Sequence, residues 1–186
     1  MTAGGGLAKM AASSAFVLTA LLAGALDTGW GSWLLGGLIA SWFGDLALIG
    51  RTRAAFLAGL GAFLLAHISY VAGFIARGIS VPTAFIGAGT MAVIGAATLV
   101  WLRPHAAGLF PAVAIYVGTS ALMVATATGT HAYASAWILV IGSVGFAASD
   151  LAVAKDRFVT PGIANRRWGR PLYFASQFLI ALASGS

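Results

Sequence analysis

The 186-residue chain is too apolar and too sparsely charged to be a water-soluble domain, because 60% of its residues are hydrophobic and only 8% are charged, against about a quarter charged in soluble domains. Its apolar runs are continuous rather than alternating, which argues against a membrane β-barrel. The formal net charge of +6 does not indicate nucleic-acid binding, because the basic residues follow the pattern of membrane insertion and lipid headgroups.

The apolar runs predict an all-α polytopic membrane protein, with residues 1–186 forming a single transmembrane helical domain. Each span needs roughly 20 residues, so we expect a bundle of about seven transmembrane helices. A short tail up to Lys9 precedes the first span, the longest loop is expected at 155–170, and there is no clear internal repeat. Lys9 and the run after it also fit a cleaved signal peptide, although so hydrophobic a chain needs no export signal. The expected spans are Met10–Leu26, Ser32–Gly50, Ala54–Ala76, Pro82–Leu102, Leu109–Gly129, Tyr133–Ala154 and Pro171–Ser184.

The ten Lys and Arg residues fall almost entirely on one side of this topology. Nine lie in the tail and in the loops after the second, fourth and sixth spans, and only Arg77 lies on the other side. Because basic loops stay in the cytoplasm, we expect the N-terminus and these loops to be cytoplasmic, in the inner membrane of a bacterium. The sequence makes no prediction about oligomeric state.

Two of the four acidic residues, Asp45 and Asp150, lie inside expected spans. A carboxylate within a bilayer is costly, so its default interpretation is functional. The two lie six and five residues before the basic ends of their spans, which places both about 7–9 Å inside the cytoplasmic boundary. This matched depth allows one shared pocket. Asp156 is expected to be a solvated loop charge and Asp27 to lie at the outer face.

Small residues beside both carboxylates indicate close helix packing. Gly37 and Ser41 share a helical face with Asp45 and lie next to a second stripe of small residues, which should turn this carboxylate toward protein. Ser149 and nearby glycines form a weaker version of the pattern beside Asp150. Such stripes are common in membrane bundles and alone indicate only packing.

Other polar side chains are expected near the carboxylates. Tyr116, Tyr173 and Gln177 fall in the same half of the membrane, whereas His67 and Tyr70 are expected deeper, nearer the outer half. Each has a structural alternative. A Tyr at the end of a span commonly anchors the interface, and a membrane His or Gln commonly bonds to a neighbouring helix.

Five short motifs contain these polar residues. They are Ser41-Trp-Phe-Gly-Asp45-Leu46, His67-Ile-Ser-Tyr70, Ala114-Ile-Tyr116 with Met123 beyond it, Phe146-Ala-Ala-Ser149-Asp150-Leu151 and Tyr173-Phe-Ala-Ser-Gln177. In order and spacing, over about residues 9–184, they resemble the YhhN family of membrane proteins, which includes lysoplasmalogenases. Lys9 resembles the family's Lys-Pro start of a helix, with Met10 in place of the proline. The family pattern has a further helix before that lysine, which implies eight helices in the family.

The resemblance implies an alkenyl ether hydrolase, in which water cleaves the vinyl ether of a lysoplasmalogen to a fatty aldehyde and glycerophosphoethanolamine or -choline. Vinyl ether hydrolysis begins with protonation of the alkene carbon and forms an oxocarbenium ion, so it needs an acid and a base or anion. Two poorly solvated carboxylates can divide these roles, as they do in glycosidases. We therefore predict that Asp45 and Asp150 form the catalytic pair, and either one could be the acid.

The other expectations concern the substrate and its surroundings. The bundle would take the alkenyl chain and the cytoplasmic Lys and Arg residues would hold the phosphate, with a related ether lipid or another lysolipid as an alternative substrate. Lysoplasmalogen and membrane lipids are the expected partners, and no cofactor or metal is expected. A small-solute or proton-coupled transporter is the leading alternative function, and a purely structural partner is another. The substrate-binding or supporting candidates are Tyr116, Tyr173, Gln177, His67, Tyr70, Ser41 and Ser149.

Overall fold

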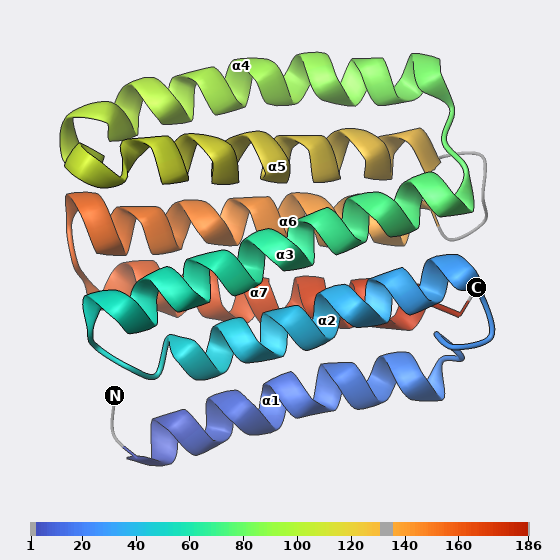
Figure 1. Cartoon of the computed structure of the whole chain (residues 1–186), viewed down its shortest axis with the longest axis horizontal. Coiled ribbons are helices and arrows are strands. Elements are labelled where there is room, and N and C mark those ends of the chain that lie inside the picture. The colour runs from blue at the N-terminus through green and yellow to red at the C-terminus, as the bar shows by residue number, and fades with distance from the viewer. Residues whose placement is uncertain (1–2, 131–135, 186) are drawn as a thin grey trace.

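The computed structural model describes residues 3–130 and 136–185 and shows a bundle of antiparallel helices (Figure 1). A 3₁₀ turn, η1 (Ala107–Leu109), joins α4 to α5, and a π-helical turn, η3 (Lys155–Val159), extends α6. Within the described residues the seven α-helices are α1 (Ala3–Leu22), α2 (Gly29–Ala47), α3 (Arg53–Arg77), α4 (Val81–Ala106), α5 (Phe110–Gly129), α6 (Ala136–Ala154) and α7 (Ile163–Ala183).

Local sequence explains where several helices begin and end. Thr28 and Thr52 cap α2 and α3, because each side-chain oxygen accepts a hydrogen bond of 3.0 Å from the backbone N–H three residues on. Pro82 and Pro111 lie in the first turns of α4 and α5, where a missing N–H costs no helical hydrogen bond. Gly78 follows α3 with a φ of 104°, a backbone conformation that glycine adopts without strain.

The helices of the described residues confirm the predicted all-α class, but the boundary of the first helix was wrong. α1 begins at Ala3, so the expected tail is largely helical. Lys9 lies inside this helix because its ammonium group pairs with a buried carboxylate on α2 and is only partly exposed. The expected start of the sixth span at Tyr133 lies outside the described residues, which resume at Ala136.

The expected long loop at 155–170 was also wrong. η3 continues from α6, only residues 160–162 lie outside helices, and α7 begins at Ile163 rather than at Pro171. The basic stretch at the start of α7 is helical because Asn165 and Gly169 are buried while the arginines around them stay exposed. This amphipathic spacing stabilises a helix that simple hydropathy does not identify.

The surface of the bundle is that of a membrane protein. On α4 the side chains of Phe85, Val93 and Val100 are 72–74% exposed, and such outward apolar faces suit contact with lipid. Four helical stretches are long and apolar enough to cross a membrane, and the third of them contains both α4 and α5. They are Gly5–Leu22, Arg53–Arg77, Val81–Gly129 and Ala136–Val159.

Positive charge is concentrated at one end of the bundle, as predicted. The N-terminal ends of the odd-numbered helices and the C-terminal ends of the even-numbered ones meet at the left of Figure 1. All the Lys and Arg residues except Arg77 belong to these segments. Arg77 lies at the opposite end, with its guanidinium group 4.3 Å from the centre of the Trp30 ring. Which end faces the cytoplasm stays a prediction.

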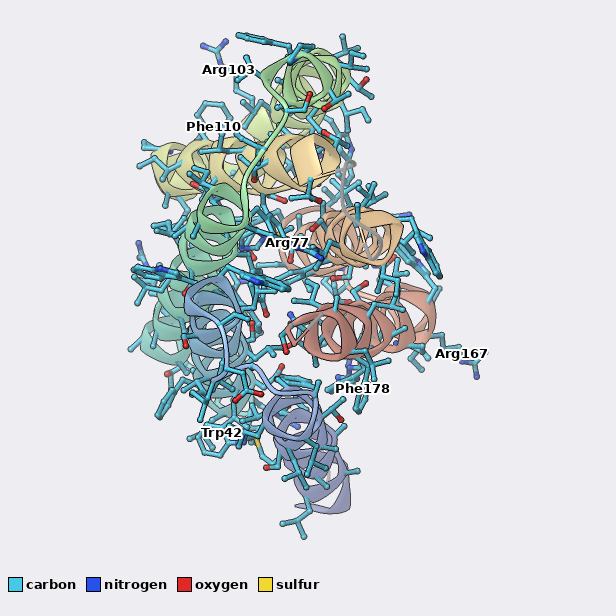
Figure 2. The ribbon with its side chains drawn as sticks, turned by 90° about the vertical axis from the view of Figure 1, so that its right-hand side faces the viewer. Trp42, Arg77, Arg103, Phe110, Arg167 and Phe178 are labelled. Atoms are coloured by element: carbon cyan, nitrogen blue, oxygen red, sulfur yellow. The ribbon has the colours of Figure 1, made fainter. Side chains whose placement is uncertain are left out.

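The helices form two units of three that share one packing pattern. Within α1–α3, α2 and α3 form a close hairpin and α1 packs on α2; within α5–α7, α6 and α7 form the hairpin and α5 packs on α6. The units interlock, because α1 also packs on α7 and α5 also packs on α3. Viewed along the bundle in Figure 2, a half-turn exchanges the two units and leaves α4 outside α5. The two units thus share a packing pattern although the sequence shows no clear internal repeat.

Candidate functional site

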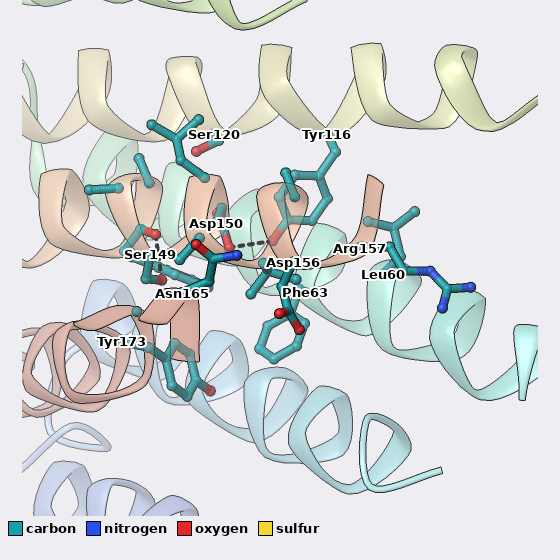
Figure 3. Close-up of a pocket in the computed structure, with 18 of the residues that line it drawn as sticks. Leu60, Phe63, Tyr116, Ser120, Ser149, Asp150, Asp156, Arg157, Asn165 and Tyr173 are labelled. Carbon is teal, nitrogen blue, oxygen red and sulfur yellow. Dashed lines mark hydrogen bonds between the residues drawn. The ribbon is translucent and has the colours of Figure 1, made fainter. Parts of the chain in front are cut away.

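A cavity of about 670 Å³ lies in the charged half of the bundle and is lined by residues from all seven helices. This volume falls in the usual range for small-molecule sites, about 300–1,000 Å³. Much of its wall is apolar, including Met91 and Ile94 from α4 and Val113 and Val117 from α5. Figure 3 shows Asp150 and Tyr173 among the residues that line the cavity.

Asp45 is 1% exposed and is held by three side chains. Lys9 places its ammonium nitrogen 3.0 Å from Oδ1, and it also donates to the Asp45 backbone carbonyl at 3.0 Å. Ser13 and Tyr173 donate to Oδ2 at 2.6 and 2.8 Å. A buried carboxylate requires a paired charge and hydrogen-bond donors, so the Asp45 centre is an ion pair with two neutral donors.

Asp150 has a different set of partners, and its side chain is 20% exposed. Tyr116 donates from its hydroxyl group to Oδ1 at 3.1 Å (Figure 3). His67, which is fully buried, places Nε2 3.4 Å from Oδ2. Its Nδ1 lies 2.7 Å from the backbone carbonyl of Phe63. Within the described residues, neither Nε2 nor Oδ2 has a hydrogen-bond partner of standard geometry.

Aromatic rings separate the two carboxylate centres. The Tyr173 ring lies 5.6 Å from the Phe146 ring, which in turn stacks at 4.5 Å on the His67 imidazole. Phe63 packs edge-on against both Phe146 and Tyr173. In the described part of the chain no hydrogen bond or ion pair joins the two carboxylates directly. Each carboxylate therefore has its own set of charged and hydrogen-bonding partners.

A second buried network lies beside Asp45 but off the cavity wall. Tyr70 donates to Oε1 of Gln177 at 2.5 Å, and Nε2 of Gln177 donates to the Ser41 hydroxyl at 3.3 Å. All three side chains are buried, and none of them lines the cavity described here. They connect α3, α7 and α2, so in this structure they position helices.

The rim of the cavity carries several cations with different partners. Arg166 lies 3.4 Å from Asp156, and Arg157 stacks 4.3 Å over a phenylalanine ring. Asp156 also accepts a hydrogen bond of 2.8 Å from the Gly162 N–H, so it holds the turn before α7 rather than being a fully solvated loop charge. Among the described residues, no acidic side chain forms an ion pair with the other two arginines of the rim. These are Arg51 and Arg170.

Among the described residues, no group of three or more His or Asp side chains is placed to hold a metal ion. Polar contact with a ligand would therefore come from the carboxylates, tyrosines and cations of the wall. The combination can bind an anionic amphiphile and transfer protons at two separate carboxyl groups.

The family model named the YhhN family matches residues 6–184. The chain belongs to the YhhN family. Similar curated proteins include one named lysoplasmalogenase TMEM86A from Bos taurus, 29% identical over 155 residues, and one named lysoplasmalogenase from Mycobacterium bovis, 34% identical over 157 residues. A lysoplasmalogenase from Mycobacterium tuberculosis matches to the same extent as the M. bovis protein.

These matches cover 80% of this YhhN chain but only 63% of the Bos taurus protein and 58% of the mycobacterial ones. The chain thus spans about three fifths of the length of these curated relatives. No solved structure matches it significantly.

The candidate residues of the YhhN motifs fall into two groups in the structure, those that line the cavity and those that belong to the buried network beside it. Asp45, Asp150, Tyr116, Tyr173 and Ser149 line the cavity, although the Ser149 hydroxyl donates within its own helix, to the Phe146 carbonyl at 2.7 Å. The depth expected for His67 was wrong, because it contacts Asp150 in the charged half rather than lying near the outer half.

Sequence reasoning missed two residues of the Asp45 centre, Lys9 and Ser13. Lys9 was assigned to the end of a tail and Ser13 was not considered. Their spacing of four residues in a helix puts both on one face, and this was the only sequence feature that could have linked them. Phe63, one of the aromatic residues that separate the two carboxylates, has no distinguishing sequence pattern, and Phe146 was named only as the first residue of the Asp150 motif.

Proposed function

We propose that this chain is a membrane-embedded ether hydrolase of the lysoplasmalogenase type, which cleaves the vinyl ether bond of a lysoplasmalogen. The observation that carries the proposal is one apolar cavity that has two carboxylates in its wall and cations at its rim. The relatives named lysoplasmalogenase support it at 29–34% identity. We place the enzyme in a bacterial inner membrane with its charged end in the cytoplasm, as the positive-inside rule requires.

The cavity divides into parts that suit a lysophospholipid. The apolar lobe between α4 and α5 would take the alkenyl chain, because its burial there removes hydrocarbon from water. Arg51 and Arg170 at the rim would bind the phosphate through charge-assisted hydrogen bonds. The vinyl ether, which joins chain and headgroup, would then lie near Asp45 and Asp150.

The chemistry requires two proton-transfer groups. A carboxylic acid protonates the outer alkene carbon, which breaks its O–H bond, forms a C–H bond and leaves an oxocarbenium ion. Water then adds to the cationic carbon and gives a proton to the other carboxylate. The bond between the hemiacetal carbon and the glycerol oxygen then breaks, and the glycerol oxygen takes the proton held by the second carboxylate. The hydroxyl group of the hemiacetal gives its proton to the first carboxylate as it becomes the aldehyde carbonyl. The products are a fatty aldehyde and the glycerophospho-alcohol. Asp45 and Asp150 are the proposed pair, as in the two-carboxylate glycosidases.

A transporter is the second candidate, and one observation favours it. The two three-helix units run in the same direction and are related by a half-turn along the bundle. Parallel repeats of this kind occur in several transporter folds, with the solute site at the interface of the repeats.

Aldehyde release from a lysoplasmalogen by the detergent-purified protein tests the two candidates. We expect release by the wild type, and a loss of at least about 100-fold in kcat for Asp45→Asn and for Asp150→Asn, since general acid–base groups contribute 10²–10⁴-fold. Asp27→Asn, the same substitution in an exposed residue at the opposite end, serves as the matched control. Wild-type protein that releases no aldehyde but carries protons or solute into liposomes would reject the hydrolase and support the transporter.

A further inference from the structure

The two carboxylates occupy equivalent places in the two three-helix units. Asp45 on α2 takes donors from α1 and α7, whereas Asp150 on α6 takes its contacts from α5 and α3. A half-turn that exchanges the two units also exchanges α1 with α5 and α7 with α3. It therefore relates the helices that contact Asp45 to the helices that contact Asp150. The carboxylates therefore take their contacts from corresponding helices, although Asp45 lies two residues before the last residue of α2 and Asp150 lies four before the last residue of α6.

The contacting residues also lie at matching positions along their helices. Lys9 and Tyr116 are each six residues beyond the first residue of their helix. Tyr173 and His67 are each ten residues before the last residue of theirs. The two centres differ in the side chains at these positions. The Lys9 ammonium group contacts Asp45, whereas the neutral phenol of Tyr116 contacts Asp150.

The contacts of His67 argue for a proton between His67 and Asp150. The Phe63 carbonyl can only accept, so Nδ1 of His67, at 2.7 Å, carries a hydrogen. In a neutral imidazole Nε2 is then a bare acceptor, and it faces Oδ2 of Asp150 at 3.4 Å. Two facing acceptors repel unless a proton lies between them. Lys9, the cation that pairs with a buried carboxylate, is committed to the other centre.

We propose that Asp150 and His67 form a neutral pair that shares one proton and supplies the proton of the reaction, while Lys9 holds Asp45 as the anion. The proposal rests on the proposed hydrolase function and assigns the two roles that this function leaves open. Burial favours the neutral pair over an imidazolium–carboxylate pair, because separated charges in an apolar site lose their hydration. His67 does not line the cavity, so it is a positioning residue that acts through Asp150.

Delivery of the proton requires only a local rotation. The terminal torsion of an aspartate is broad and roughly two-fold, so a half-turn of the Asp150 carboxyl group exchanges Oδ1 and Oδ2. The protonated oxygen then faces the cavity, and its O–H bond breaks as the alkene C–H bond forms. Tyr116 donates to the carboxylate that remains. Water adds to the cation and gives its proton to Asp45. Asp45 passes that proton to the glycerol oxygen as the hemiacetal breaks, and the hemiacetal hydroxyl returns one to Asp150.

Two spectroscopic measurements on the purified full chain test the charge states without any substrate. Infrared spectra should show the carbonyl stretch of a protonated carboxylic acid, lost in Asp150→Asn and retained in Asp45→Asn. Nitrogen NMR of protein labelled at its three histidines should show a neutral, Nδ1-protonated imidazole whose signal disappears in His67→Gln, apart from any signal of His105, whose Nδ1 also faces a backbone carbonyl. A band lost instead in Asp45→Asn, no such band, or a doubly protonated His67 would overturn the proposal.

Two substitutions of His67 separate proton sharing from simple packing. Gln can donate to the Phe63 carbonyl and accept from Asp150, whereas Phe preserves the ring that stacks on Phe146 but makes neither bond. We expect His67→Gln to keep kcat within about tenfold of wild type and His67→Phe to lose about 100-fold, with KM unchanged within about threefold in both. Equal kcat values for the two variants would overturn the role of His67.

The outcomes for the two proposals are distinguishable. If the wild type releases no aldehyde, the hydrolase function fails, yet the spectra still report which carboxyl carries the proton. If aldehyde is released and the protonated carboxyl is not that of Asp150, only the division of roles fails.

Discussion

Replacement of Lys9 by Met should destabilise the bundle strongly, because it leaves the Asp45 carboxylate buried without a counter-charge. Asp45 is 1% exposed, and the Lys9 ammonium group, whose side chain is 14% exposed, lies 3.0 Å from it. Removing one partner of a buried ion pair costs about 3–5 kcal/mol. Ser13 and Tyr173 remain as neutral donors and cannot replace a full charge. The free energy of unfolding, measured by steric trapping in bicelles, should fall by this amount.

The double variant Lys9→Met/Asp45→Asn provides the internal control. The amide introduced on α2 keeps an acceptor for the Ser13 and Tyr173 hydroxyls but carries no charge, so the second substitution should recover about 2 kcal/mol or more of the loss. Met preserves the length and apolar stem of Lys, so the substitution removes only the ion pair and the hydrogen bond from Lys9 to the Asp45 backbone carbonyl. If Lys9→Met alone costs less than about 1 kcal/mol, or if the second substitution recovers nothing, the ion pair does not hold α1 to α2 as described.

Three further substitutions probe packing, chain binding and headgroup binding. A methyl group at Gly37 would overlap the Tyr70 ring, so Gly37→Ala should lower the free energy of unfolding by about 1–3 kcal/mol. Gly95 lines the apolar lobe, and Gly95→Leu should lower kcat/KM for long alkenyl chains relative to short ones by about tenfold or more. Arg170→Gln should raise KM for a lysoplasmalogen about tenfold with kcat unchanged, as loss of uniform binding requires.

Two of these substitutions, Gly37→Ala and Arg170→Gln, have a matched comparison. Gly118→Ala on α5 adds the same methyl where no atom lies within 4 Å, so its stability should not fall. Arg103→Gln removes a cation from the same end of the bundle but away from the cavity wall, so KM should stay at the wild-type value. Equal behaviour within either pair, or a chain-length profile for Gly95→Leu like that of the wild type, would contradict the assigned contacts.

Composition and charge were enough to predict the class of fold and the segregation of basic residues. These depend on averages over about twenty residues, which the bilayer enforces. The burial of Asp45 also followed from the small residues one and two turns before it, Ser41 and Gly37. The start of α7 did not follow, because its first turns are basic and amphipathic and carry no long apolar run.

Side-chain contacts between different helices could not be predicted from the sequence, because they depend on which helices become neighbours. Tyr173 contacts a carboxylate 128 residues away, and no local spacing encodes that. His67 was placed in the wrong half because its depth was counted along one helix, whereas its position relative to Asp150 depends on how α3 and α6 cross α5. The shared packing pattern accounts for both pairings at once, since each carboxylate takes contacts from one helix of its own unit and one helix of the other. The two carboxylates can then serve different chemistry because the side chains at both matched positions differ, with Lys9 and Tyr173 beside Asp45 and with Tyr116 and His67 beside Asp150. On this view the charge at position 9, rather than any feature of the two aspartates, decides which of them carries the proton.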